Sequence, residues 1–275
     1  MQTTSIDSPA GTATVLDHGA TVMSWQPHGH RPVLFTSSAA VFAEDTALRG
    51  GIPLCFPWFG PGRTPGAPRS HGFARTATWT LVSDASIADE RTLTYRLSRG
   101  EATDAHWPHD YWATLTVTVG ADLTVALSVT NLDTEPFSYE AALHTYLAVE
   151  SIHRVRIDGL DGISFVDKTA GGAVRRQDGP LTFSGETDNV YATPGSVTVL
   201  DGDREIVVEN TGASHVIVWN PWQEKAADIR DLGAGEWEKF VCVEAGRVLD
   251  GAVEVEPGAT HTLSTTIRVS GSATT

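Results

Sequence analysis

A short segment of the chain combines a cation, two adjacent glycines and several aromatic side chains. The run RGGIPLCFPWFG, residues 49–60, begins with an arginine and ends in prolines and aromatic residues. A guanidinium can bind a phosphate or carboxylate through two parallel hydrogen bonds, and glycines let the backbone come close to a ligand. Phe56, Trp58 and Phe59 supply flat apolar faces of the kind on which sugars stack. The segment therefore predicts a binding loop.

Five further motifs follow in order along the chain. The first, SHGFAR, places an imidazole and a second guanidinium four residues apart, at His71 and Arg75. The others are LHTY (143–146), ETDNVY (186–191), VWNPW (218–222) and FVCVEAGRV (240–248). Each motif alone is a weak signal, but six of them in a plausible order and spacing rarely agree by accident.

Together the motifs resemble the hexose-6-phosphate mutarotases, also called glucose-6-phosphate 1-epimerases, a branch of the aldose 1-epimerase superfamily. The resemblance extends from about Arg49 to about Val248. It implies an all-β fold, the large twisted antiparallel β-sandwich of galactose mutarotase-like proteins, with the site in a cleft on one concave sheet. It also implies a small-molecule sugar phosphate as the substrate.

Interconversion of α and β anomers needs one base and one acid. The base takes the proton of the C1 hydroxyl while the acid protonates the ring oxygen, so that the ring opens and can close on the other face. By resemblance the base is Glu244 and the acid is His144. A carboxylate with a pKa near 4.3 and a histidine with a pKa near 6.5 suit these roles. The reaction requires no metal, nucleotide or redox cofactor.

Without the resemblance, both residues have simpler interpretations. Glu244 interrupts an apolar run and could face water near a strand end, and His144 could be a buried structural histidine. The resemblance also places His71 near the ring oxygen and anomeric hydroxyl, and gives Asp188 the role of accepting hydrogen bonds from sugar hydroxyls. An isolated Asp188 would instead suggest a local turn before Asn189.

The candidate phosphate ligands are Arg49 and Arg75, for which the alternative is an ion pair with one of the many acidic residues. Arg69 lies in a Pro/Gly-rich segment, longer and more basic than the resemblance predicts, that suggests a surface lid or turn. Whether Arg69 joins the phosphate site is left open. Trp219 and Trp222 could form an apolar wall of the site or belong to the core. Lys225 could supplement the arginines, although an exposed surface lysine is the simpler interpretation.

Two other motifs do not support a site. His106 and His109 have ligand-like spacing, but a proline separates them and no cysteine or third histidine stands nearby, which argues against zinc. The GGIPL run lacks the Gly-Lys-Ser/Thr ending of a phosphate-binding Walker loop.

The charge balance limits the partners. The chain has 19 Lys and Arg against 34 Asp and Glu, a formal net charge of −15. Such a field repels nucleic acids and anionic membranes, so we expect neither as a partner. The same field opposes a sugar phosphate, so Arg49 and Arg75 would have to overcome it locally.

Length and local composition predict one cytoplasmic domain. The 275 residues suit a single β-sandwich, which we place over 1–275 with loose ends at about 1–10 and 270–275, and which we expect to be a monomer. The first residues lack a basic start and an apolar segment, and no run of about 18 apolar residues occurs. Cys55 and Cys242 lie far apart inside apolar runs, so a disulfide is not required.

The dominant hydrophobic period along the chain is two residues, as in half-buried strands. Residues 114–119 and 123–129 alternate across a Gly-Ala-Asp turn, which predicts a hairpin. The other predicted strands are 91–97, 153–157, 196–200, 205–209, 215–219, 238–243, 252–255 and 260–269. At most, residues 224–231 form a short helix. The pattern alone predicts an antiparallel sandwich or barrel.

The sequence thus predicts a cofactor-free mutarotase of hexose 6-phosphates, with glucose 6-phosphate first. Two alternatives remain. One is a mutarotase of unphosphorylated aldoses, which would not need Arg49 and Arg75. The other is a non-catalytic sugar-binding or regulatory protein on the same sandwich, because a fold does not fix a function.

Overall fold

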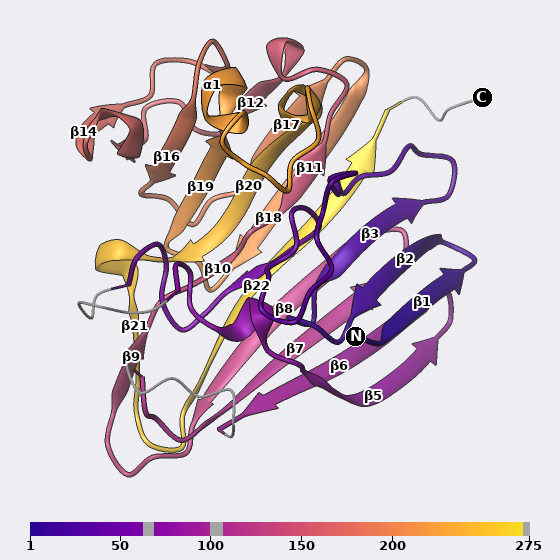
Figure 1. Cartoon of the computed structure of the whole chain (residues 1–275), viewed down its shortest axis with the longest axis vertical. Coiled ribbons are helices and arrows are strands. Elements are labelled where there is room, and N and C mark those ends of the chain that lie inside the picture. The colour runs from indigo at the N-terminus through magenta and orange to yellow at the C-terminus, as the bar shows by residue number, and fades with distance from the viewer. Residues whose placement is uncertain (63–68, 100–106, 272–275) are drawn as a thin grey trace.

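The fold is described from a computed structural model and covers residues 1–62, 69–99 and 107–271. Within these residues the chain forms two large antiparallel sheets (Figure 1). The larger sheet has the strand order β15-β12-β17-β18-β22-β8-β7-β6-β5. Its strands are β15 (Leu181–Thr182), β12 (Arg156–Asp158), β17 (Val197–Asp201), β18 (Arg204–Thr211), β22 (Thr260–Ser270), β8 (Leu123–Asn131), β7 (Tyr111–Val119), β6 (Glu90–Ser98) and β5 (Thr80–Ile87).

The second large sheet has the order β14-β13-β16-β19-β20-β10-β4, with β11 also paired to β20. Its strands are β14 (Ala173–Arg176), β13 (Ser164–Asp167), β16 (Thr187–Tyr191), β19 (His215–Asn220), β20 (Phe240–Arg247), β10 (Ala141–Leu143), β4 (Leu54–Cys55) and β11 (Tyr146–Ala148). We call it the site sheet, because the cleft described below lies on it.

Two small sheets and several short helices complete the described structure. The small sheets are β1 (Thr3–Ser8) with β2 (Gly11–Leu16) and β3 (Val22–Pro27), and β9 (Phe137–Tyr139) with β21 (Val253–Val255). The α-helix is α1 (Trp222–Ala226). The 3₁₀ turns are η1 (Ala74–Thr76), η2 (Ile152–Arg154), η3 (Lys168–Ala170), η4 (Glu236–Lys239) and η5 (Leu249–Gly251).

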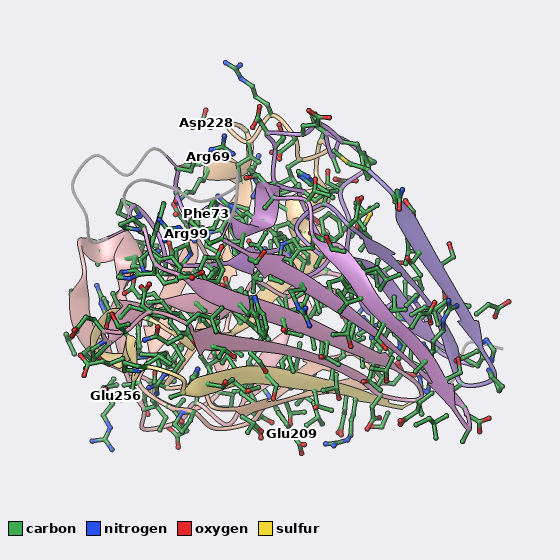
Figure 2. All side chains as sticks on the ribbon, turned by 90° about the horizontal axis from the view of Figure 1, so that it is seen from below. Arg69, Phe73, Arg99, Glu209, Asp228 and Glu256 are labelled. Atoms are coloured by element: carbon green, nitrogen blue, oxygen red, sulfur yellow. The ribbon has the colours of Figure 1, made fainter. Side chains whose placement is uncertain are left out.

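The alternating pattern explains the larger sheet. In the β7–β8 hairpin every second side chain is buried, and Val119 pairs with Leu123 across the predicted turn. The buried side chains share one apolar cluster with the inner face of the site sheet, for example Leu127 of β8 with Val218 of β19. Side chains stand on both faces of the sheets, with Arg69 on one side of the molecule and Glu209 and Glu256 on the opposite side (Figure 2). The predicted antiparallel sandwich is confirmed.

Strand β20 has a different pattern because both of its faces are covered. All its residues from Phe240 to Gly246 are buried, so no polar alternation marks it in the sequence. Its side chains Val243 and Ala245 join the main core, whereas Glu244 between them faces the other side of the sheet. The interpretation of Glu244 as a water-facing residue is therefore wrong.

Several predicted boundaries are also wrong. The N-terminus is not loose, because β1 pairs with β2 from Thr3 to Ser8 and buries Ile6 in the core. Only one of the six side chains of β1 is buried, so the sequence lacks the alternating pattern that predicts a strand there. Ser270 ends β22, and residues 272–275 lie outside the described part. The one-domain organisation remains a prediction.

Three predicted elements shift along the chain. The strand expected at 153–157 begins with the 3₁₀ turn η2, in which buried Ile152 enters the core, and β12 follows it. The strand expected at 238–243 begins only at Phe240, after η4. The helix expected at 224–231 is confined to Trp222–Ala226, and three-residue turn bonds replace helical bonds from Ala227 to Ile229.

Candidate active site

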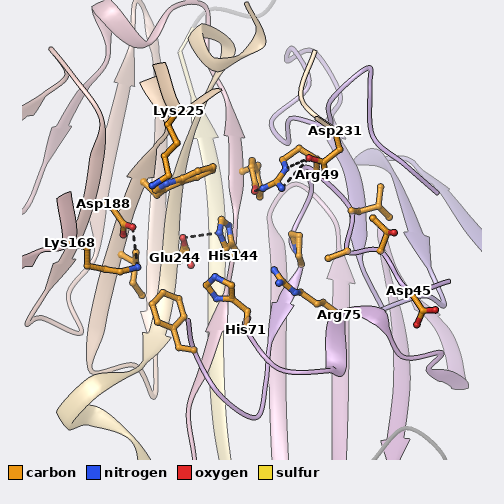
Figure 3. Close-up of a pocket in the computed structure, with 18 residues that line it drawn as sticks. Asp45, Arg49, His71, Arg75, His144, Lys168, Asp188, Lys225, Asp231 and Glu244 are labelled. Carbon is orange, nitrogen blue, oxygen red and sulfur yellow. Dashed lines mark hydrogen bonds and ion pairs between the residues drawn. The ribbon is translucent and has the colours of Figure 1, made fainter. Parts of the chain in front are cut away.

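A cleft of about 480 Å³ lies on the outer face of the site sheet. It brings together residues that are far apart in the sequence, among them the predicted acid and base, the two predicted phosphate ligands and the two predicted sugar contacts. These residues are Arg49, His71, Arg75, His144, Asp188 and Glu244, together with Trp219. Figure 3 shows Arg49, His71, Arg75 and Asp188 around a central pair formed by His144 and Glu244.

The central pair is held by the backbone of the site sheet. Glu244 stands in β20, and His144 directly follows β10, which pairs with β20. The His144 backbone N–H donates to the carbonyl of Pro53 at 3.0 Å. Nε2 of His144 lies 3.4 Å from Oε1 of Glu244. Strands give such a pair a rigid mounting.

Both members of the pair are deeply buried. Their side chains are 13% exposed for His144 and 1% for Glu244. Among the described residues, nothing forms a hydrogen bond to Nδ1 of His144 or to Oε2 of Glu244. Unpartnered polar atoms in such a site cost free energy unless a ligand satisfies them. The pair is therefore prepared to exchange hydrogen bonds with a bound molecule.

Burial shifts the two pKa values in opposite directions. Burial raises the pKa of Glu244 well above its ordinary value, and the carboxylate of Asp188 adds to this. Burial lowers the pKa of His144 well below its ordinary value, and His71, Arg75 and Arg49 add to this. In the empty cleft these shifts favour a neutral Glu244 beside a neutral His144. The ordinary pKa values assumed from the sequence do not hold here.

The two predicted phosphate ligands lie on one side of the pair (Figure 3). Nη2 of Arg49 lies 3.2 Å from Oδ1 of Asp231, and its Nη1 donates to the hydroxyl of Tyr146 at 3.1 Å. The ion pair considered from the sequence is thus present, inside the cleft. Nη2 of Arg75 donates to the carbonyl of Ser70 at 2.5 Å, and no described carboxylate pairs with it. Arg75 therefore carries the less neutralised positive charge.

The other side of the cleft holds a second ion pair. Nζ of Lys168, in η3, lies 3.1 Å from Oδ2 of Asp188 and 5.1 Å from the ring centre of Phe59. Asp188 stands in β16 and not in a local turn. No motif surrounds Lys168, so the sequence does not identify it as a site residue. It reaches the cleft only because β13, which precedes it, pairs with β16.

The remaining candidates divide between cleft and core. Trp219 lines the cleft, whereas Trp222 packs on Trp237 with ring centres 4.9 Å apart and does not line it. Lys225 is 47% exposed and lines the cleft, where its ammonium lies 2.5 Å from Oε1 of Glu186. Lys225 is therefore an exposed lysine, as the simpler interpretation held, at a position that also lines the cleft.

Arg69 is not among the described residues that line the cleft. Its guanidinium donates to Thr76 at 2.8 Å and to Asp45 at 3.0 Å. Arg63, the other arginine of the Pro/Gly-rich segment, lies outside the described residues.

The aromatic residues of the first motif also separate. Phe56 is fully buried and packs against Trp107 with ring centres 5.3 Å apart, and Trp58 is buried and donates to the carbonyl of Arg69 at 2.8 Å. Phe59 alone of the three lines the cleft. The stacking surface predicted from Phe56 and Trp58 is therefore wrong, because their rings belong to the core.

One of the excluded histidines pairs with a carboxylate, and the two cysteines are free. Nδ1 of His109 pairs with Asp133 at 2.9 Å, and His106 lies outside the described residues. Cys55 and Cys242 are both buried free thiols.

Along the described chain, no helix is both long and apolar enough to cross a membrane.

Comparisons with known proteins give the family of the chain. The family model described as aldose 1-epimerase matches residues 2–268. A relative from Escherichia coli K12, named "Putative glucose-6-phosphate 1-epimerase", is 36% identical over 243 residues, which cover 87% of this chain and 81% of the relative.

Solved structures give the same result. A crystal structure described as a "putative mutarotase" from Salmonella typhimurium has a TM-score of 0.91 and 33% identity, and the match covers 98% of this chain and 90% of that one. A galactose mutarotase-like protein from Clostridium acetobutylicum, at 14% identity and a TM-score of 0.77, shares the fold over 98% of this chain and 95% of its own. The predicted galactose mutarotase-like sandwich is therefore confirmed, and the chain belongs to the aldose 1-epimerase family.

Proposed function

We propose that this protein interconverts the α and β anomers of hexose 6-phosphates, with glucose 6-phosphate as the first substrate. The observation that carries the proposal is the buried His144–Glu244 pair, in a cleft whose side wall holds the incompletely neutralised Arg75. Family membership supports the reaction class, and the name of the Escherichia coli relative supports the phosphorylated substrate.

The reaction proceeds by proton transfers between the sugar and the two side chains of the central pair. Glu244 takes the proton of the C1 hydroxyl, a C1–O double bond forms, the bond from C1 to the ring oxygen breaks, and the ring oxygen takes a proton from His144. Rotation about the C1–C2 bond and the reverse steps give the other anomer. Both side chains are neutral while the sugar is open. Because burial favours this neutral pair, it lowers the cost of the open-chain stage.

The phosphate would lie on the arginine side of the pair. With the phosphate near Arg75 and Arg49, the far end of the sugar lies toward Asp188 and Lys168 (Figure 3). The ion pair of Asp231 with Arg49 holds that guanidinium in the wall. A guanidinium group that is already held in place loses little side-chain entropy when it binds a phosphate.

The function is tested by measuring anomer exchange. Polarimetry or NMR exchange with glucose 6-phosphate is expected to show acceleration over the buffer rate in proportion to enzyme concentration. Glucose and galactose, measured side by side, test the alternative of an unphosphorylated aldose, for which they would react at least as well. Binding of sugars without any exchange would favour the non-catalytic alternative.

The substitution Arg75→Ala is expected to raise KM for glucose 6-phosphate more than it lowers kcat. A charge-assisted hydrogen bond contributes about 1.5–3 kcal/mol, which corresponds to a roughly 10- to 150-fold change in affinity. The interaction exists in both ground and transition states, so kcat changes less. Steady-state kinetics with glucose 6-phosphate and glucose checks this, and glucose should be nearly unaffected.

Arg69→Ala is the matched control for this substitution. It removes the same charge a few residues away, from a guanidinium that does not itself line the cleft and is bound to Thr76 and to the exposed carboxylate of Asp45, which does. We expect wild-type kinetics with both sugars. An equal loss of turnover of both sugars in Arg75→Ala would mean that Arg75 has a structural role only.

Added salt should change KM for glucose 6-phosphate but not KM for glucose. Salt screens partly exposed charges, with a Debye length of about 10 Å at 0.1 M and about 3 Å at 1 M. KM for glucose 6-phosphate is therefore expected to rise with added salt, because fixed cations hold the phosphate in an otherwise acidic protein. KM for glucose should stay constant. A common response of both sugars would contradict an electrostatic phosphate site.

A further inference from the structure

His71 lines the cleft beside the central pair, with its ring centre 6.1 Å from that of His144. Its backbone has a φ of 65°, in the left-handed region that residues with a side chain rarely adopt. Two hydrogen bonds hold this conformation. The His71 N–H donates to the carbonyl of Gly60 at 2.7 Å, and its carbonyl accepts from the N–H of Phe56 at 3.3 Å. Strain of this kind collects at functional sites.

The contacts of the ring determine which nitrogen carries the proton. The backbone N–H of Gly60 donates to Nδ1 of His71 at 3.2 Å. A backbone amide can only donate, so Nδ1 must accept and carries no hydrogen. Sγ of Cys55 lies 3.3 Å from the same nitrogen and must then present its S–H. A neutral imidazole with an unprotonated Nδ1 holds its proton on Nε2.

The surroundings keep this imidazole neutral. Burial, followed by the charges of Arg75, Lys168 and Arg49, lowers the pKa of His71 to about 3. A second proton would have to enter at Nδ1, against the Gly60 N–H and near these three cations. Burial also raises the pKa of the Cys55 thiol, so the thiol keeps its hydrogen as a donor.

Nε2 is the free end of the ring. Within the described residues, no group accepts a hydrogen bond from it, although every other polar atom of His71 is engaged by the loop. The ring itself is fixed edge-on to Phe59, with ring centres 4.9 Å apart. A donor that is fixed in position, lines the cleft and has no acceptor among the described residues has a ligand oxygen as its natural partner.

We propose that Gly60 and Cys55 are positioning residues that hold His71 as a permanently neutral Nε2–H donor directed at a sugar oxygen. The role of the donor in turnover rests on the proposed mutarotase function, but the protonation state does not. His71 therefore contributes a hydrogen bond and no proton transfer. The reaction's proton belongs to His144 and Glu244 alone.

The tautomer is measured directly by NMR. In protein labelled with ¹⁵N-histidine, the signals of His71 are identified by their loss in His71→Gln. We expect a protonated Nε2 and an unprotonated Nδ1 that do not change between about pH 5.5 and about pH 8, across the ordinary histidine pKa. A protonated Nδ1, or titration near the ordinary pKa, would overturn the proposal. This readout does not depend on activity.

Two amide substitutions test the donor in catalysis. Glutamine can place an N–H where Nε2 stands, whereas the shorter asparagine reaches only the position of Nδ1. We expect His71→Gln to keep kcat/KM for glucose 6-phosphate within about 10-fold, and His71→Asn to lose on the order of 100-fold. If only the backbone conformation at this position mattered, His71→Asn would be the more active variant, because asparagine adopts the left-handed region more readily than glutamine. Asparagine equal to or better than glutamine would show that the position matters only for the backbone.

The thiol is tested by a matched pair of substitutions. Cys55→Ala removes the donor to Nδ1 and is expected to lower kcat/KM by about 3- to 10-fold, as for one neutral hydrogen bond. Cys55→Ser supplies a hydroxyl donor and should restore most of the loss. If serine is as impaired as alanine, or alanine is fully active, Cys55 does not position His71. Absence of exchange in the wild type would instead reject the proposed function and leave the NMR result standing.

Discussion

The substitution Glu244→Gln is expected to lower anomer exchange of glucose 6-phosphate by about 100- to 10,000-fold, the usual contribution of a general base. The amide keeps the shape of the side chain and cannot take the C1 proton. Because Arg75 and Arg49 remain in place, the affinity for the sugar phosphate should change little. Exchange NMR gives the rate, and calorimetry gives the affinity. A loss of less than threefold would remove Glu244 from the base role.

Stability provides a control for the same variant. The folded-state pKa of Glu244 is raised above its unfolded value. The group therefore binds its proton more tightly in the folded state, and stability falls as the pH rises from the unfolded pKa toward the folded one. A neutral glutamine avoids this loss. We expect Glu244→Gln to unfold at an equal or higher temperature than the wild type near pH 7, so that low activity is not a sign of misfolding.

Replacing His144 by asparagine is expected to lower the rate of anomer exchange of glucose 6-phosphate by about 100-fold or more.

The exchange rate of the wild type should also depend on pH with a bell shape, because one proton must be shared between His144 and Glu244. The pKa shifts place the acidic limb below the ordinary histidine pKa and the alkaline limb above the ordinary glutamate pKa. The two limits belong to the pair as a whole.

The pH profile separates the partners when chemistry is rate-limiting. Because the base must be ionised and the acid must be protonated, Glu244→Gln should flatten the acidic limb of the residual rate, and His144→Asn the alkaline limb. A wild-type rate that is flat on the alkaline side would contradict a shared catalytic proton.

The sequence predicted the parts of the fold in which one strand face is buried. Strands β7 and β8 alternate over their whole length, so their hairpin could be recognised from the period alone. Strand β20 was predicted only in part, at 238–243, because cover on both faces removes the alternation from Glu244 onward. The N-terminal strand β1 was missed because its pairing with β2 uses backbone hydrogen bonds and only Ile6 marks it as buried.

For the site, too, the sequence predicted only the residues that local motifs mark. His144 and Glu244 were identified by the motifs around them, and the structure places them 3.4 Å apart. Their pKa shifts could not be predicted, because burial depends on packing that local sequence does not encode. Lys168 and Asp231 were missed for a related reason. Each enters the cleft through strand pairing or a distant loop, and each is recognised by its partner, Asp188 or Arg49.

The most direct test of the account compares two sugars and two proteins in one experiment. Magnetisation transfer between the α and β C1 signals of glucose 6-phosphate and of glucose would be measured with the wild type and with Glu244→Gln. We predict fast exchange for glucose 6-phosphate with the wild type, much slower exchange for glucose, and a rate near that of buffer with Glu244→Gln. Exchange of glucose 6-phosphate at the buffer rate with the wild type, or unchanged exchange with Glu244→Gln, would contradict a hexose-6-phosphate mutarotase that works through this carboxylate.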